Sequence, residues 1–131
     1  MDPEYASAYN SRCLAYIHVG FNDKALSDCS RLIQLKPDFT SHIKHRLAYL
    51  YDQRGIAYKE QHVYGQALRS FNKAIEVEPD DARAYFNRGL ILFGAKYYDK
   101  GWIDINKAQS LGLKIDPEDL AKLKKISAKV E

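Results

Sequence analysis

The chain has 131 residues, of which 46% are hydrophobic and 28% charged, and its formal net charge is +3. These values are typical of one globular domain with a real core, while two cysteines, seven glycines and four prolines exclude a disulfide-dense scaffold or a Pro/Gly-rich disordered segment. No apolar run approaches the roughly 18 residues that a membrane span needs, and the first residues lack the pattern of a signal peptide. We therefore expect a cytoplasmic protein without membrane insertion.

The sequence repeats itself at two offsets. At an offset of 34 residues, Tyr51–Tyr58 aligns with Tyr85–Leu92, and the match continues through a whole period. At an offset of 42 residues a further copy begins at Tyr9, which aligns with Tyr51. The chain therefore contains three copies, with eight extra residues between the first and the second.

Each copy holds two blocks of small and apolar residues at helical spacing. In the second copy these blocks are Tyr51, Gly55, Tyr58 and Ala67, Phe71, Ala74. A small residue in one helix opposite a small residue in the other lets two backbones approach closely, and Pro79 cannot continue the second helix. Each copy is predicted to be a helical hairpin, and the hairpins must stack because one hairpin buries only one face.

This pattern resembles the tetratricopeptide repeat (TPR), a helix-turn-helix unit of about 34 residues, over residues 6–115. The second copy matches the signature positions at Tyr51, Arg54, Gly55, Tyr58, Ala67, Phe71, Ala74 and Pro79. The other copies depart from it at Cys13, Cys29, Leu92, Gly101 and Leu113. The resemblance implies an all-α, right-handed α-solenoid of three TPR helical hairpins plus a C-terminal capping helix, with a concave groove that binds a peptide or helix of another protein.

We expect a single domain over residues 1–131. Its parts are repeat one (6–39), a helical extension (40–47), repeat two (48–81), repeat three (82–115) and a capping helix (116–131). The first residues, Pro3–Tyr5, are similar to the end of a repeat at Pro37–Phe39, which predicts a fragment of a longer array. The capping helix begins after Asp116, and its outer face carries Lys122, Lys124, Lys125 and Lys129.

The eight extra residues are interpreted as a lengthening, by about two turns, of the first helix of repeat two, which would then run from about 41 to 61. This places Ile43 and Leu47 beyond the neighbouring hairpin. We expect them to cover a flank of repeat one. The alternative is that they mediate self-association with a second chain.

In a TPR-like stack, one stripe of each first helix faces the concave side. The candidate peptide-binding groove comprises Asn10, Leu14, Ile17, Tyr49, Asp52, Ile56, Lys59, Arg83, Phe86, Leu90 and Phe93. Its apolar centre suits an apolar or amphipathic segment, with the charged residues orienting it. This predicts a protein-protein interaction module or scaffold, although some of these residues would instead pack against neighbouring helices.

Chaperone-binding TPR domains grip an acidic C-terminal tail with a carboxylate clamp of Lys, Arg and Asn side chains. The matching positions here hold Asn10, Leu14, Gln53, Arg83 and Asn87, so most of the donors are missing. A chaperone-tail adaptor is therefore disfavoured. Nucleic acid is also a disfavoured partner, because acidic residues interrupt any continuous basic stripe.

No phosphate loop, nucleophile elbow or pair of catalytic carboxylates is present, so we expect no enzyme activity, no cofactor and no small-molecule substrate. His42 and His45 share a helix face, but no metal is expected because no further ligands are nearby. Cys13 and Cys29 occupy repeat positions that face each other inside one hairpin. Buried free thiols are the favoured interpretation, and a disulfide is the alternative.

Overall fold

The computed structural model describes residues 3–128, which contain seven α-helices, one 3₁₀ turn and no strand. The elements are α1 (Pro3–His18), α2 (Asn22–Leu35), η1 (Pro37–Phe39), α3 (Thr40–Glu60), α4 (Tyr64–Val77), α5 (Ala82–Gly94), α6 (Tyr98–Ser110) and α7 (Pro117–Ala128). No helix of the described part is both long and apolar enough to cross a bilayer. Lys129, expected on the capping helix, lies outside the described residues.

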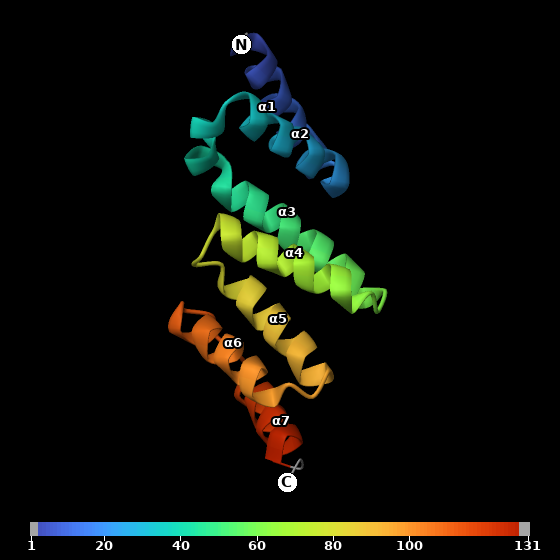
Figure 1. Cartoon of the computed structure of the whole chain (residues 1–131), viewed down its shortest axis with the longest axis vertical. Helices are drawn as coiled ribbons and strands as arrows, with labels where there is room; N and C mark the ends of the chain where they lie inside the picture. The colour runs from blue at the N-terminus through green and yellow to red at the C-terminus, as the bar shows by residue number, and fades with distance from the viewer. Residues whose placement is uncertain (1–2, 129–131) are drawn as a thin grey trace.

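Successive helices form hairpins that stack along one long axis, with the two ends of the chain at opposite ends of the stack (Figure 1). Helix α1 packs on α2, α3 on α4 and α5 on α6, and neighbouring hairpins meet through α2 with α3 and α4 with α5. The fold class predicted from the sequence, an all-α solenoid of three hairpins followed by a C-terminal helix, is thus confirmed.

Glycine is required where the two helices of a hairpin touch. A Cβ atom on Gly55 would lie 2.7 Å from Cε1 and Cζ of Phe71, whose side chain is fully buried. In the third hairpin a Cβ atom on Gly89 would lie 3.0 Å from the carbonyl oxygen of Gly101. The close approach inferred from the repeat pattern therefore has a direct steric cause.

The first hairpin replaces this glycine by Cys13, which forms a disulfide with Cys29 of α2. The Cα atoms of the two residues are 5.8 Å apart, and both side chains are fully buried. The interpretation as two free thiols was therefore wrong. Residues 13 and 29 face each other across α1 and α2, and their Cα atoms are within the separation that a disulfide allows.

A residue with positive φ lies two residues after the end of the first helix of each hairpin. Gly20 has φ of 84°, while His62 and Lys96 occupy the equivalent places with φ of 62° and 67°. Glycine adopts this left-handed conformation without a steric penalty, whereas a residue with a Cβ atom does not. The second and third turns are therefore less favourable than the first.

Helix α3 is 21 residues long and belongs to two cores. Ile43 and Leu47, only 3% and 5% exposed, pack with the buried residues of the first hairpin. Tyr51 packs against the first core and also against the second, which contains Phe71. The alternative that Ile43 and Leu47 offer a surface for self-association was therefore wrong, because their side chains already cover the core of their own chain.

Candidate peptide-binding groove

The predicted groove residues come from α1, α3 and α5, the first helices of the three hairpins. Leu14 and Tyr49 are large apolar side chains with exposures of 39% and 43%, and Arg83 is also exposed. Six others are half-buried: Asn10, Ile17, Ile56, Lys59, Phe86 and Leu90. These nine side chains remain accessible on the first helices.

Phe93 does not belong to this surface. Its side chain is 5% exposed, and its ring centroid lies 5.3 Å from those of Tyr98 and Trp102 in edge-to-face contacts. The ring also covers Gly101, where an added Cβ atom would lie 2.5 Å from Cδ2 of Phe93. Phe93 is therefore a core residue of the third hairpin, because Gly101 leaves space that an alanine would fill.

Asp52 also differs from the expectation, because it is not an exposed orienting charge. Its side chain is buried, at 6% exposure, and lines a cavity of about 230 Å³. This cavity, the Asp52 pocket, is lined by Tyr49, Asp52, Ile56, Glu78, Asp81 and Arg83, among others. The pocket therefore combines two helices of the predicted groove with the turn that joins α4 to α5.

The Asp52 pocket gathers three carboxyl groups. Burial, together with the facing Asp81, raises the pKa of Asp52 to about 9, and Arg83 opposes this effect. Asp81 caps α5, because its Oδ1 accepts a hydrogen bond of 3.3 Å from the amide nitrogen of Ala84. Glu78 pairs with the imidazole of His45. Asp52 is therefore protonated at neutral pH and shares a hydrogen bond with the carboxyl group of Asp81.

A second hollow adjoins the Asp52 pocket along α5. This hollow, the Phe86 pocket, has a volume of about 330 Å³ and is lined in part by Arg83, Phe86, Leu113 and Ile115. Arg83 lines both cavities. The cavity beside α3 and the cavity beside α5 therefore share one lining residue, the basic side chain of Arg83.

The groove residues of α1 are held in a different way. Arg46 of α3 donates a hydrogen bond of 2.6 Å from Nη1 to the side-chain oxygen of Asn10. Burial lowers the pKa of Arg46 and also that of Lys59, which lies farther along α3. Arg46 and Lys59, which lie near opposite ends of α3, are therefore both partly enclosed by the protein.

Sequence reasoning did not include Glu78 and Asp81 among the candidate site residues. The sequence carries one signal for them, because both flank the boundary between the second and third repeats next to Pro79. Their contact with Asp52 depends on how the third hairpin packs on the second. Among residues 3–128, no three His, Cys, Asp or Glu side chains are arranged as a metal site would require.

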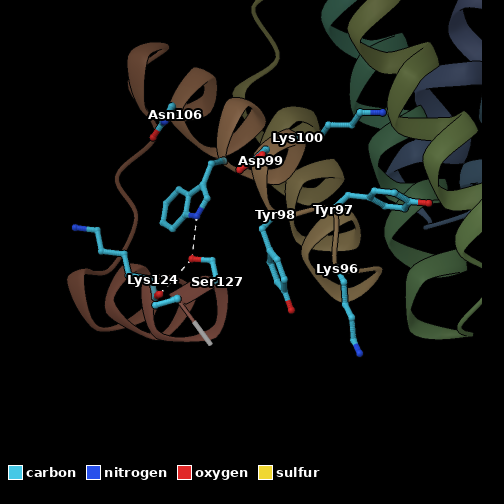
Figure 2. A pocket seen from close by; sticks show the side chains of 10 residues that line it. Lys96, Tyr97, Tyr98, Asp99, Lys100, Asn106, Lys124 and Ser127 are labelled. Carbon is cyan, nitrogen blue, oxygen red and sulfur yellow. Dashed lines mark hydrogen bonds between the residues drawn. The ribbon is translucent and has the colours of Figure 1, made fainter. Parts of the chain in front are cut away.

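A cavity of about 840 Å³ lies outside the predicted groove, between α6 and α7 (Figure 2). Figure 2 shows Lys124 and Ser127 of α7 on one side of it and Tyr98 on the other. The indole nitrogen of Trp102 donates a hydrogen bond of 3.2 Å to Oγ of Ser127. Because α7 has no fully buried side chain, this cavity results from the light packing of the last helix.

Known proteins match this chain both in a sequence repeat and in the fold. Residues 55–96 match the family model for the TPR repeat. The first TPR domain of Spaghetti (RPAP3), bound to an HSP90 peptide, superposes with a TM-score of 0.58 at 20% identity and covers 98% of this chain and 94% of its own. The TPR2B domain of yeast Sti1, in a complex with pHsp70, gives 0.52 at 18% identity over 96% and 95%. Residues 55–96 therefore match a TPR repeat, and the fold of the whole described chain is that of these TPR domains.

In two relatives the segment that matches this chain is a small part of a much longer protein. Mouse protein O-mannosyl-transferase TMTC1 is 27% identical over 128 residues, which are 92% of this chain and 13% of that protein. The UDP-N-acetylglucosamine–peptide N-acetylglucosaminyltransferase of Giardia intestinalis is 39% identical over 66 residues, which are 50% of this chain and 4% of that protein. The similarity therefore covers a small part of each transferase.

Proposed function

We propose that this protein-interaction module binds an apolar or amphipathic peptide or helix of a partner protein in the groove formed by α1, α3 and α5. The binding involves no chemical reaction. Its main determinants are the accessible side chains of α3 and α5, above all Tyr49, Ile56, Phe86 and Leu90. The chain would act as a scaffold that holds its partner through a preformed surface.

One observation carries this proposal: the Asp52 and Phe86 pockets adjoin at Arg83. A segment that crosses Arg83 can insert one side chain into each pocket while its apolar face covers Tyr49 and Ile56. The two TPR domains compared above are named for complexes with chaperone peptides, which supports a peptide as the ligand of a similar surface.

The nature of the groove favours an apolar or amphipathic segment over an acidic C-terminal tail. Asn10 and Leu14 stand where a carboxylate clamp needs a lysine and an asparagine, and Asn87 stands where it needs an arginine. Arg83 is the one cation at a clamp position, and it lines both pockets. The carboxyl groups of Glu78 and Asp81 in the Asp52 pocket are acceptors and offer an acidic tail no donor. Among the alternatives, the chaperone-tail adaptor is therefore the one that this geometry supports least.

The proposal is tested by selection from a displayed library of random 12-residue peptides, followed by calorimetric titration of an enriched peptide. The double variant Phe86→Ala/Leu90→Ala is expected to weaken binding by about 1 to 3 kcal/mol, because it removes apolar contacts that the ligand buries. Ile103→Ala is the matched control, since Ile103 is 67% exposed and lies on α6, outside the groove.

Helix content by circular dichroism accompanies each titration. A folded double variant that binds as tightly as wild type would show that the ligand lies elsewhere. Loss of helix content in the double variant would show that Phe86 and Leu90 are core residues instead. Equal weakening by Ile103→Ala would also contradict a specific role of the groove.

A further inference from the structure

The same ion pair occurs in the first and third hairpins. Arg12 donates two hydrogen bonds of 2.7 Å to the carboxylate of Asp28, and Arg88 donates two of 2.8 Å to that of Asp104. In each pair the arginine lies on the first helix, and the buried aspartate follows 16 residues later on the second. The arginine at this repeat position therefore holds a carboxylate in a two-bond geometry.

Arg54 occupies the same repeat position in the second hairpin, but the aspartate is missing there. The residue 16 positions later is Ser70, which is buried, at 5% exposure, and carries no charge. Within residues 3–128, the side chain of Arg54 donates one hydrogen bond, from Nε to Asp23 at 3.2 Å. Because a guanidinium group has five N–H donors, Nη1 and Nη2 of Arg54 are available to an oxygen ligand from outside the chain.

A cavity lies between α3 and α4 beside the missing carboxylate. This cavity, the Ser70 pocket, has a volume of about 250 Å³, and part of its lining is formed by Arg54, Tyr58, Gln66, Arg69 and Ser70. The third hairpin has a cavity of about 280 Å³, lined by the residues 34 positions further along, which are Arg88, Leu92, Lys100, Ile103 and Asp104. The two cavities are therefore one feature of the repeat, which contains a carboxylate in the third hairpin and a hydroxyl group in the second.

The charge of the Ser70 pocket favours an anion. The described residues that line it include three cations, Arg54, Arg69 and Lys73, and no Asp or Glu. In the cavity of the third hairpin, by contrast, Asp104 supplies a negative charge and Ile103 stands in place of Arg69. The second hairpin therefore lacks the internal anion and has an additional cation at the same place.

Two acidic side chains lie near the Ser70 pocket without lining it. Asp23 pairs with Arg54 at 3.2 Å, and Glu76 pairs with Lys73 at 3.7 Å. These two carboxylates are 82% and 72% exposed, so both contacts are weak. A carboxylate from outside that enters the pocket can therefore replace them as the partner of its cations.

The Ser70 pocket and the peptide-binding groove lie on different faces of α3. Arg54 is two residues from Asp52 and two from Ile56, and two residues turn a helix by about 200°. Tyr51 and Tyr58, which also line the pocket, are three residues before and four residues after Arg54 and share its helix face. Their half-buried rings offer apolar contacts to a segment that crosses the pocket. The pocket and the groove can therefore be occupied independently.

We propose that the Ser70 pocket is a second binding site, which takes the carboxylate of an Asp or Glu side chain from a partner protein. This carboxylate accepts from Arg54 the two hydrogen bonds that Asp104 accepts from Arg88, and the other two cations of the pocket add positive charge. The inference goes beyond the proposed function, because the segment is acidic and lies on α3 and α4 outside the groove. The scaffold then holds two segments of different chemistry on two faces.

The test is an NMR titration of the full, isotope-labelled chain with the peptide Ala-Ala-Glu-Ala-Ala, whose ends are acetylated and amidated to remove their charges. Two further peptides carry glutamine or phosphoserine in place of glutamate, and the salt concentration is the same throughout. We expect the Nε–H signal of Arg54 to shift saturably with the glutamate peptide and to stay in place with the glutamine peptide. The Nε–H signals of Arg12 and Arg88 serve as internal controls, because these side chains are already paired.

The variant Ser70→Asp supplies the missing carboxylate within the chain. It should weaken binding of the glutamate peptide by at least about tenfold, because charge-assisted hydrogen bonds to Arg54 are then already made. Ser70→Asn is its uncharged match and should bind about as tightly as wild type. Arg54→Lys should also lose about tenfold, since lysine keeps the charge without the two-bond geometry. The backbone amide signal of Arg69, beside the pocket, reports the affinity in all variants.

Several outcomes would overturn the inference. They are the absence of a saturable shift with the glutamate peptide, equal affinity for the glutamine peptide, and undiminished binding by Ser70→Asp or Arg54→Lys. Tenfold tighter binding of the phosphoserine peptide would assign the pocket to a phosphorylated segment and overturn the carboxylate assignment. The groove is tested with other peptides and other variants, so failure of this inference leaves the proposed function intact.

Discussion

The guanidinium of Arg88 holds the carboxylate of Asp104 by two hydrogen bonds, from Nε and from Nη2, each 2.8 Å long. Arg12 and Asp28 form the same two-bond pair in the first hairpin at 2.7 Å, again 16 residues apart. In both pairs the carboxylate is buried on the second helix of the hairpin. A planar, two-bond pair of this kind sets the register between two helices.

The second hairpin lacks this pair. Ser70 stands 16 residues after Arg54, where the other hairpins have aspartate, and Arg54 instead reaches Asp23 of the preceding hairpin at 3.2 Å. Asp23 is largely exposed, so this contact is worth little. Ser70→Asp is expected to form a two-bond pair with Arg54 and to raise the free energy of unfolding by about 1 kcal/mol. Urea denaturation measures the change, with Ser70→Asn as the uncharged control; equal effects of both variants would contradict the pairing.

The turn conformations predict a second way to stabilise the fold. His62→Gly and Lys96→Gly should each raise the free energy of unfolding by about 0.5 to 1 kcal/mol, because glycine adopts positive φ without steric conflict. Gly20→Ala should have the opposite effect at the equivalent turn. Thermal unfolding of the three variants checks the signs. Destabilisation by both glycine substitutions would show that the side chains of His62 and Lys96 contribute more than the strain removes.

The disulfide predicts a dependence on reductant. Opening the bond between Cys13 and Cys29, which are 16 residues apart, should lower the free energy of unfolding by about 2 to 3 kcal/mol, because it frees a loop of the unfolded chain. Urea denaturation with and without a phosphine reductant measures this effect. The Cys13→Ala/Cys29→Ala variant is the control and should be insensitive to the reductant. Identical wild-type curves in both conditions would contradict a disulfide in solution.

The raised pKa of Asp52 predicts how the stability of the fold changes with pH. Its pKa is about 9 in the folded chain but about 3.9 when unfolded, so between these values the folded state binds more protons. The contribution of Asp52 to the free energy of unfolding therefore falls as the pH rises from about 4 to about 9, and it is constant above that range.

Asp52→Asn removes this dependence and should be more stable than wild type by about 1 to 2 kcal/mol at pH 8. Chemical denaturation at pH 5 and pH 8 tests the sign, with the exposed Asp23→Asn as control. Equal stability of both proteins at the two pH values would contradict the raised pKa.

The helices and their stacking were predictable from local patterns. Small and apolar residues such as Gly55, Phe71 and Ala74 recur at helical spacing, and the period of the repeats leaves each hairpin with a face that only another hairpin can bury. The lengthened helix is present as α3, from Thr40 to Glu60, and Ile43 and Leu47 at its start lie in the first core. These features depend on contacts within one repeat or between successive repeats.

The sequence by itself determined the fold class, the hairpins and the helices from which the candidate groove is built, because periodicity decides which faces are buried. Only the tertiary structure decided which side chains on these faces stay open. Phe93 is buried because Gly101 on the facing helix leaves space for its ring. Asp52 is buried because the turn after α4 brings Asp81 against it. Such placements depend on side-chain volumes and packing angles across helices, which no spacing along one chain expresses.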